Sequence, residues 1–393
     1  MRCTPSLLVS ALARLLLLLG TRAREDETMH VLSTLQHSLM GVASGGPEAA
    51  AAQAMWSSVG ALAGSQATPR PAPVLAYITP WNGAGYELAK RHRCRLHLLS
   101  PVWFQLRALN GAPQLTGAHN VNVGWMEALR APCPEASSNT DGGGLAPGRG
   151  DASRVLPRVI FEIGGPDLGA ILARPREVAS LLADVAQEHG FDGWVVEAWS
   201  GWAAMGVTQH AQARGAALEL LRQLAAQLHS AGRALVLAVS PLLPAPGRPA
   251  QLTAGDAAEL LGFVDALSVM TYDHATQQPG PNAPLPWVVQ NADAFASVAD
   301  RLPSGSARSK VLLGIPFYGN EYSFRGKQLE RAEAVTSKRL LEVLAQKASL
   351  ENSAAAAGPA EAAVSETTVA AERGLGVSVW ELGQGVEEMA ALL

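Results

Sequence analysis

The residues best suited to chemistry in this chain are aromatic rings that lie close to carboxylates and hydroxyls. Aromatic residues make up only 5% of the chain, so their recurrence at the ends of short apolar runs is informative. The candidates are Tyr77, Trp81, Glu162, Glu197, Trp199, Met270, Tyr272, Asp273 and Trp380. A sugar ring packs its C–H face on an aromatic ring while polar groups bond its hydroxyls. The set therefore predicts a saccharide-binding site, although any one of these aromatics could instead be a core residue.

Eight apolar runs must position these side chains. They span residues 74–80, 96–104, 155–162, 193–199, 234–240, 266–273, 311–318 and 376–381. Helical patterns lie between several of them, for example from Val178 to Gly190 and from Leu218 to Gly232. Apolar strands that alternate with helices predict a parallel sheet covered on its outer face. Eight such strands predict an α/β fold, the closed (β/α)8 TIM barrel, in which functional groups gather at the carboxyl ends of the strands.

Composition excludes several classes of partner. The net charge of −4 and the pI near 6.2 give no electrostatic reason to expect nucleic acid or an anionic membrane surface. No segment reaches the ~18 uninterrupted apolar residues of a membrane span. The nine histidines show no metal-binding spacing, and the glycine-rich segment 164–169 lacks the spacing of a nucleotide-binding loop. We expect no metal, no cofactor and no Gly-x-Ser-x-Gly nucleophile.

The ends of the chain suggest export and flexible segments. Arg2 followed by the apolar stretch 7–20 predicts a signal peptide over residues 1–23, with a buried core helix as the alternative. We therefore expect a secreted protein, or one delivered to a lysosome-like compartment. Residues 24–72 form a low-complexity N-terminal segment, and 132–151 and 348–371 are similar in composition. Cys94 and Cys133 either pair or remain free thiols.

Several motifs, in order along the chain, resemble the strand signatures of glycoside hydrolase family 18 chitinases. They are residues 77–81, 191–193, 270–273, 314–319 and Trp380. The resemblance extends with gaps from Pro73 to the C-terminus and implies that 73–393 form the family's barrel. Residues 77–82, 100–103, 191–199, 279–285 and 378–385 resemble one branch of chitinase-like members. That branch implies binding of oligosaccharides or polysaccharides that contain N-acetylglucosamine, or of lipopolysaccharide, and an endocytic receptor as a partner, although no motif shows the receptor.

The resemblance also implies roles for individual residues, but the family's catalytic acid has no counterpart in this chain. It implies that Trp380 floors the central sugar subsite, that Trp81 forms a groove wall, and that Tyr272 and Asp273 contact the acetamido and neighbouring groups. The family's fourth strand carries Asp-Gly-x-Asp-x-Asp-x-Glu, whose glutamate is the acid of a substrate-assisted reaction. Aligned on residues 192–193, this chain has Val195 and Glu197 at the two later aspartates and Trp199 at the acid.

Depth along the strand argues against Glu197 as a replacement acid. Side chains alternate, so 195, 197 and 199 are all expected to face inward. Glu197 would then lie about 6–7 Å below the acid position, whereas an acid must approach within about 3 Å of the oxygen that it protonates. Glu197 could bond Tyr272 and the floor of the sugar site, be a satisfied core carboxylate, or be lifted to the rim by a bulge. Asp192 is expected to belong to the turn that begins the strand.

One departure concerns the wall of the groove. The family places a small α+β insertion after strand seven, and the segment from Gly319 to Leu375 lacks the aromatic-rich strands expected there. We expect that insertion to be reduced or absent. The sequence thus predicts an inactive homologue that binds saccharide. A weak hydrolase that uses Glu197 and a protein-binding scaffold with a degenerate groove are the alternatives.

Overall fold

The structure, a computed structural model, describes residues 73–131, 152–275, 279–303, 307–325, 328–337, 339, 359–385, 389–390 and 393. The predicted signal peptide, the N-terminal low-complexity segment, the insertion 132–151 and residues 348–358 lie outside these ranges. The strands are β1 (Val74–Ile78), β2 (Leu98–Pro101), β3 (Phe104–Leu109), β4 (Ala112–Thr116), β5 (Arg154–Val155), β6 (Arg158–Phe161), β7 (Gly193–Glu197), β8 (Ala234–Val239), β9 (Ala266–Val269), β10 (Val311–Pro316), β11 (Tyr318–Arg325), β12 (Gln328–Thr336) and β13 (Gly376–Trp380).

Apart from β4, which runs antiparallel to β3, the strands of the larger sheet are parallel and curl into a ring. Its order is β4-β3-β6-β7-β8-β9-β10-β13-β1-β2-β5, and β5 leads into β6 across only Leu156 and Pro157. One broken strand therefore pairs with β2 through β5 and with β7 through β6. Asp192, just before β7, bonds the end of β5, because its carboxylate accepts the N–H of Val155 at 2.8 Å. The predicted TIM barrel is confirmed, and each of the eight apolar runs contributes one of its strands.

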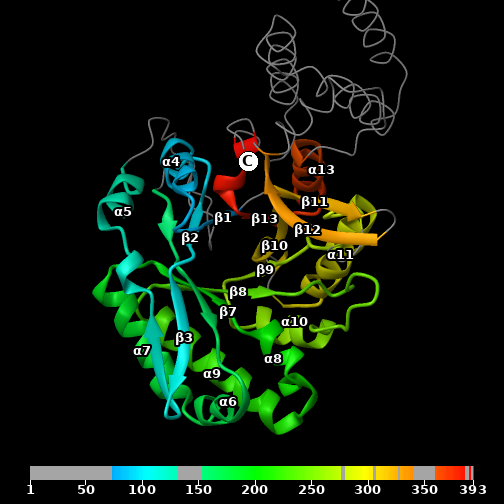
Figure 1. Cartoon of the computed structure of the whole chain (residues 1–393). Helices are drawn as coiled ribbons and strands as arrows, with labels where there is room; N and C mark the ends of the chain where they lie inside the picture. The colour runs from blue at the N-terminus through cyan, green and yellow to red at the C-terminus, as the bar shows by residue number, and fades with distance from the viewer. Residues whose placement is uncertain are drawn as a thin grey trace, which may run out of the picture.

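Helices cover the outside of the ring (Figure 1). They are α4 (Gly83–Arg91), α5 (Val123–Leu129), α6 (Gly165–Leu172), α7 (Pro175–Glu188), α8 (Trp199–Ala204), α9 (Ala211–Ser230), α10 (Ala254–Leu261), α11 (Leu285–Ala299) and α13 (Pro359–Glu372). Short 3-10 turns are η2 (Ala118–Asn120), η3 (Val207–Gln209), η4 (Ala307–Lys310) and η5 (Leu382–Gln384). The two helices predicted from periodicity are α7 and α9, and each is followed by a glycine with positive φ, Gly190 and Gly232.

Two hydrophobic clusters separate the faces of the ring. Alternate residues of β1 illustrate the division: Leu75 and Tyr77 belong to the inner cluster, while Val74 and Ile78 pack against the helices. The inner cluster also contains Val195, so the inward face of β7 is the face that carries residues 195 and 197.

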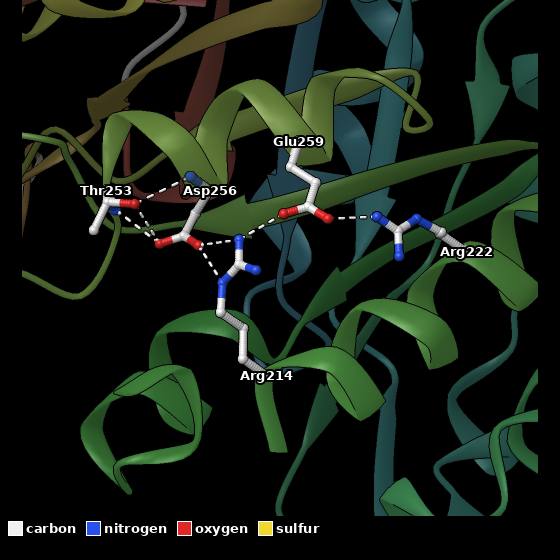
Figure 2. A network of polar contacts seen from close by, with 5 residues as sticks. All are labelled: Arg214, Arg222, Thr253, Asp256 and Glu259. Carbon is white, nitrogen blue, oxygen red and sulfur yellow. Dashed lines mark hydrogen bonds and ion pairs between the residues drawn. The ribbon is translucent and has the colours of Figure 1, made fainter. Parts of the chain in front are cut away.

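A polar network joins α9 to α10 (Figure 2). Arg214 contacts Asp256 at 2.7 Å and Glu259 at 2.6 Å, and Glu259 also pairs with Arg222. Thr253 caps α10 through a reciprocal capping box with Asp256. Each of the two carboxylates thus has a guanidinium partner, and the network ties α10 to the first half of α9.

The structure adds one hairpin to the sequence predictions and agrees with another prediction, that the insertion after strand seven is reduced or absent. The run 96–104 splits, because β2 ends at Pro101 and Phe104 begins β3, which turns back into β4 through Asn110 and Gly111, both with positive φ. Asn-Gly between extended segments is a strong hairpin signal. The insertion after strand seven, expected to be reduced or absent, is present in reduced form. The strands β11 and β12 form an antiparallel hairpin there, so it is reduced to this hairpin within the described part of the chain.

Two further features bear on the earlier expectations. Cys94 forms a disulfide, and Cys133 lies outside the described ranges. Within the ranges that the structure covers, no helix is both long and apolar enough to cross a membrane.

Candidate functional site

The carboxyl ends of the barrel strands bring together five of the nine predicted site residues. The indole of Trp380, at the end of β13, lies 5.1 Å from the ring of Tyr77 with an interplanar angle of 58°, and it packs against the inner cluster. Glu197 and Tyr272 interact electrostatically with Tyr77 and with each other, and Asp273 does so with Tyr272. These five residues therefore form one aromatic and polar cluster at the upper end of the barrel interior.

Below Trp380, hydroxyl groups form a buried chain. Tyr77 Oη donates to Ser268 Oγ at 2.9 Å, and Ser268 Oγ donates to Ser378 Oγ at 2.9 Å. Tyr77 is only 2% exposed and packs its ring against the Trp380 indole. The hydroxyl chain therefore holds in place a ring on which the indole rests. Burial raises the pKa of Tyr77 well above its usual value, the bond to Ser268 opposes this, and Glu197 adds to it. The phenol stays protonated and acts as a donor at any physiological pH.

Sequence reasoning missed the ion partner of Glu197. Arg158, on β6, places Nε and Nη2 each 2.6 Å from Glu197 Oε2. The same guanidinium lies over the ring of Trp380, 5.6 Å from its centroid, which is within the range of a cation–π contact. Its side chain is 11% exposed and that of Glu197 is 26% exposed. A charged residue at an inward-facing position of an otherwise apolar strand was the available signal.

This pairing decides between the alternatives for Glu197. Its hydrogen-bond partner among the described residues is Arg158 and not Tyr272. The ladder from Gly193 to Glu197 runs without interruption beside β8, so no bulge lifts the carboxylate to the rim. Glu197 is an inward, paired carboxylate in the upper barrel.

Asp273 and Tyr318 form a second polar unit beside this cluster. Tyr318 Oη donates to Asp273 Oδ1 at 2.5 Å, and the side chain of Asn282 accepts from the Asp273 N–H and donates to the carbonyl of Tyr318. Asp273 has φ of +59°, an uncommon conformation that Asp tolerates better than most residues. Burial raises the pKa of the Tyr318 phenol, and Asp273 raises it further.

The hairpin after strand seven is tied to the same loop. Tyr322 Oη, on β11, donates to the carbonyl of Ala275 at 2.5 Å. Asp273, Ala275 and Asn282 are therefore bonded to Tyr318 or Tyr322, which ties the described part of the loop after β9 to the hairpin.

Three other predicted site residues differ in their exposure. Trp81 is 73% exposed, as a stacking residue of a groove wall requires. Glu162 is exposed and pairs with Arg107 at 2.7 Å. Met270 is half-buried at the end of β9.

The predicted inward position of Trp199 is wrong. The strand β7 ends at Glu197, Ala198 leaves the extended conformation with φ −143° and ψ −44°, and Trp199 begins α8. Its ring is 1% exposed and belongs to the cluster that packs against the helices. Alternation applies only while a strand lasts, so residue 199 contributes to the outer core and not to the site.

Comparison with protein families places residues 157–384 in the glycosyl hydrolases family 18. This match covers more than half of the chain. The chain belongs to glycosyl hydrolase family 18. It is also similar to solved structures, among them a chitinase from Chromobacterium violaceum at 20% identity, with a TM-score of 0.60 over 81% of this chain and 96% of that one.

Two further solved structures share the fold. The spore cortex-lytic enzyme SleL of Bacillus cereus is 15% identical, with a TM-score of 0.61 over 84% of this chain and 75% of that one. A Group II chitinase catalytic domain of Ostrinia furnacalis, crystallised as a mutant with penta-N-acetylchitooctaose, is 14% identical, with a TM-score of 0.53 over 79% of this chain and 90% of that one. At such identities the likeness extends to the family 18 barrel.

Proposed function

We propose that this family 18 chain is a secreted, chitinase-like protein that binds saccharides and does not hydrolyse them. The ligand class is an oligosaccharide or polysaccharide that contains N-acetylglucosamine. The aromatic surfaces of Trp380 and Trp81, with the polar groups of Glu197, Tyr272 and Asp273 between strand ends, support binding. The penta-N-acetylchitooctaose held by the Ostrinia furnacalis relative supports the same ligand class.

The position of Trp199 carries the proposal that hydrolysis is absent. The residue aligned with the family acid is an indole that is 1% exposed and packed in the outer core, and an indole N–H is no proton donor at neutral pH. Glu197 does not replace it, because it lies on β7, two residues before the acid position, and its carboxylate is held by the Arg158 guanidinium at 2.6 Å, whereas an acid must approach within about 3 Å of the oxygen that it protonates. Both observations support a binding protein.

The motif similarities noted above support a narrower placement. We propose that the chain lies in the branch of chitinase domain-containing protein 1, also called stabilin-1-interacting chitinase-like protein. That placement extends the proposal to lipopolysaccharide as a ligand, to an endocytic receptor as a partner and to a lysosome-like destination. The disulfide at Cys94 supports an oxidising compartment.

Isothermal titration with chitotetraose tests the binding. Wild-type protein is expected to bind, and Trp380→Ala is expected to weaken the affinity by about tenfold or more through the lost ring face, with Trp380→Phe between the two. Thermal unfolding of each variant controls for folding. No heat at millimolar ligand, with Trp380→Ala indistinguishable from wild type, would leave a protein-binding scaffold as the better account.

A separate assay tests the absence of hydrolysis. Incubation with chitin oligomers is expected to release no reducing ends beyond the buffer blank. Release that disappears in Glu197→Gln would overturn the proposal and establish a weak hydrolase.

A further inference from the structure

Arg158 stands at the point where the polar and aromatic parts of the site meet. Its guanidinium contacts the carboxylate of Glu197 on one side and the indole of Trp380 on the other. Both contacts to the carboxylate go to Oε2. Among the described residues, neither Glu197 Oε1 nor Arg158 Nη1 forms a further hydrogen bond, and the guanidinium that carries Nη1 lies over the Trp380 ring.

The charge balance of this cluster depends on the same residue. Glu197 is 26% exposed, and the other carboxylate of the cluster, Asp273, already accepts a hydrogen bond from Tyr318. Without Arg158, Glu197 would be an unpaired carboxylate beside an aromatic ring. That combination attracts cations, because the carboxylate and the face of the ring both favour positive charge.

We propose that Arg158 determines selectivity at this site between N-acetylated and deacetylated amino sugars. The inference rests on the proposed saccharide-binding function. An acetamido group is neutral and offers one C=O acceptor and one N–H donor, so it can accept from Arg158 Nη1 or donate to Glu197 Oε1 without bringing a charge next to the guanidinium. The ammonium of a deacetylated sugar offers only donors and a positive charge. The guanidinium repels that charge and already holds the carboxylate that would bind it.

Titrations with two probes test the assignment. Tetra-N-acetylchitotetraose and its fully deacetylated counterpart are titrated at mildly acidic pH, where the amines carry a proton. Wild-type protein is expected to prefer the acetylated probe by at least about tenfold. In Arg158→Met the acetylated probe weakens and the deacetylated probe strengthens by about tenfold, so the preference is lost or reversed, and the gain decreases with added salt.

Further variants separate charge from shape and folding. The double variant Arg158→Met with Glu197→Gln is expected to lose the gain for the deacetylated probe, because the freed carboxylate is gone. Arg158→Lys keeps the charge and is expected to exclude that probe even if Arg158→Met proves unstable. Arg308→Met removes an equivalent arginine from its exposed pair with Asp300 and should leave both affinities unchanged.

The outcomes distinguish this inference from the proposed function. If wild-type protein binds neither probe, the saccharide-binding proposal fails and the inference with it. If wild-type protein prefers the acetylated probe but Arg158→Met keeps that preference unaltered, or Arg158→Lys loses it, only the role of Arg158 is refuted. A deacetylated probe that gains equally in the double variant would also refute it.

Discussion

The buried hydroxyl chain beneath Trp380 allows a quantitative test of how the site is supported. Tyr77→Phe removes one hydrogen bond, which costs about 1 kcal/mol of unfolding free energy. Ser268→Ala costs more, about 2 kcal/mol, because it leaves the Tyr77 hydroxyl, in a residue only 2% exposed, without its acceptor at 2.9 Å. The double variant removes both partners, so its cost should stay near 2 kcal/mol instead of the sum of about 3 kcal/mol.

Urea unfolding of the four proteins measures this cycle. The expected coupling between the two positions is at least about 1 kcal/mol. Ser297→Ala, whose hydroxyl bonds the carbonyl of Asp293 on an exposed helix surface, serves as the control and should change stability by no more than about 0.5 kcal/mol. Strictly additive single-variant costs would mean that the two hydroxyls do not depend on each other, and the description of a supporting chain would be abandoned.

Two other positions give predictions for stability. Gly193→Ala should destabilise the barrel by more than about 3 kcal/mol, because Gly193 has φ +149° and an added Cβ would lie 2.0 Å from the carbonyl oxygen of Ala234. Gly83 has open space around it, so Gly83→Ala should be tolerated and serves as the control. Similar unfolding midpoints for the two variants would contradict this prediction. Glu366→Gln should be more stable than wild type at neutral pH. Burial raises the pKa of Glu366 well above its usual value, so the folded protein holds the proton that the unfolded chain releases, and wild-type stability falls as pH rises above the unfolded value near 4.5. Melting temperatures across pH measure this, and a difference from the variant that does not change with pH would refute it.

The fold was predictable because its signal is repeated. Each of the eight barrel strands arises from an apolar run, and burial on both faces of a parallel sheet requires such runs. The two glycines after α7 and α9 marked helix ends that the structure also has. The hairpin of β3 and β4 was not predicted, because the apolar run 96–104 continues without a break across the end of β2 and the start of β3. Asn110-Gly111 was the available hairpin signal.

The site was predictable in composition but not in orientation. Tyr77, Glu197, Tyr272, Asp273 and Trp380 come together because the ends of parallel strands must meet. The position of Trp199 depends on where β7 ends. The φ and ψ angles of Ala198 set that end, and the alternation of apolar residues along the strand does not predict them.

Arg158 was missed for a different reason. Its role comes from contacts with Glu197 on the neighbouring strand β7 and with Trp380 on β13, which are 39 and 222 positions away in the chain. Neither distance along the sequence suggests such a contact.

The segment that closes the barrel also bears on how activity is inferred from motifs. Asp192 accepts a hydrogen bond from the N–H of Val155, the last residue of β5, and Gly193 lets the backbone of Ala234 approach closely. Phe191 packs among aromatic rings of the outer core. These three residues begin the family's fourth-strand signature, yet here their contacts serve barrel closure. The signature thus has a structural half and a chemical half, and a chain can keep the first while losing the second. A search that scores only its beginning detects a closed barrel and not an enzyme.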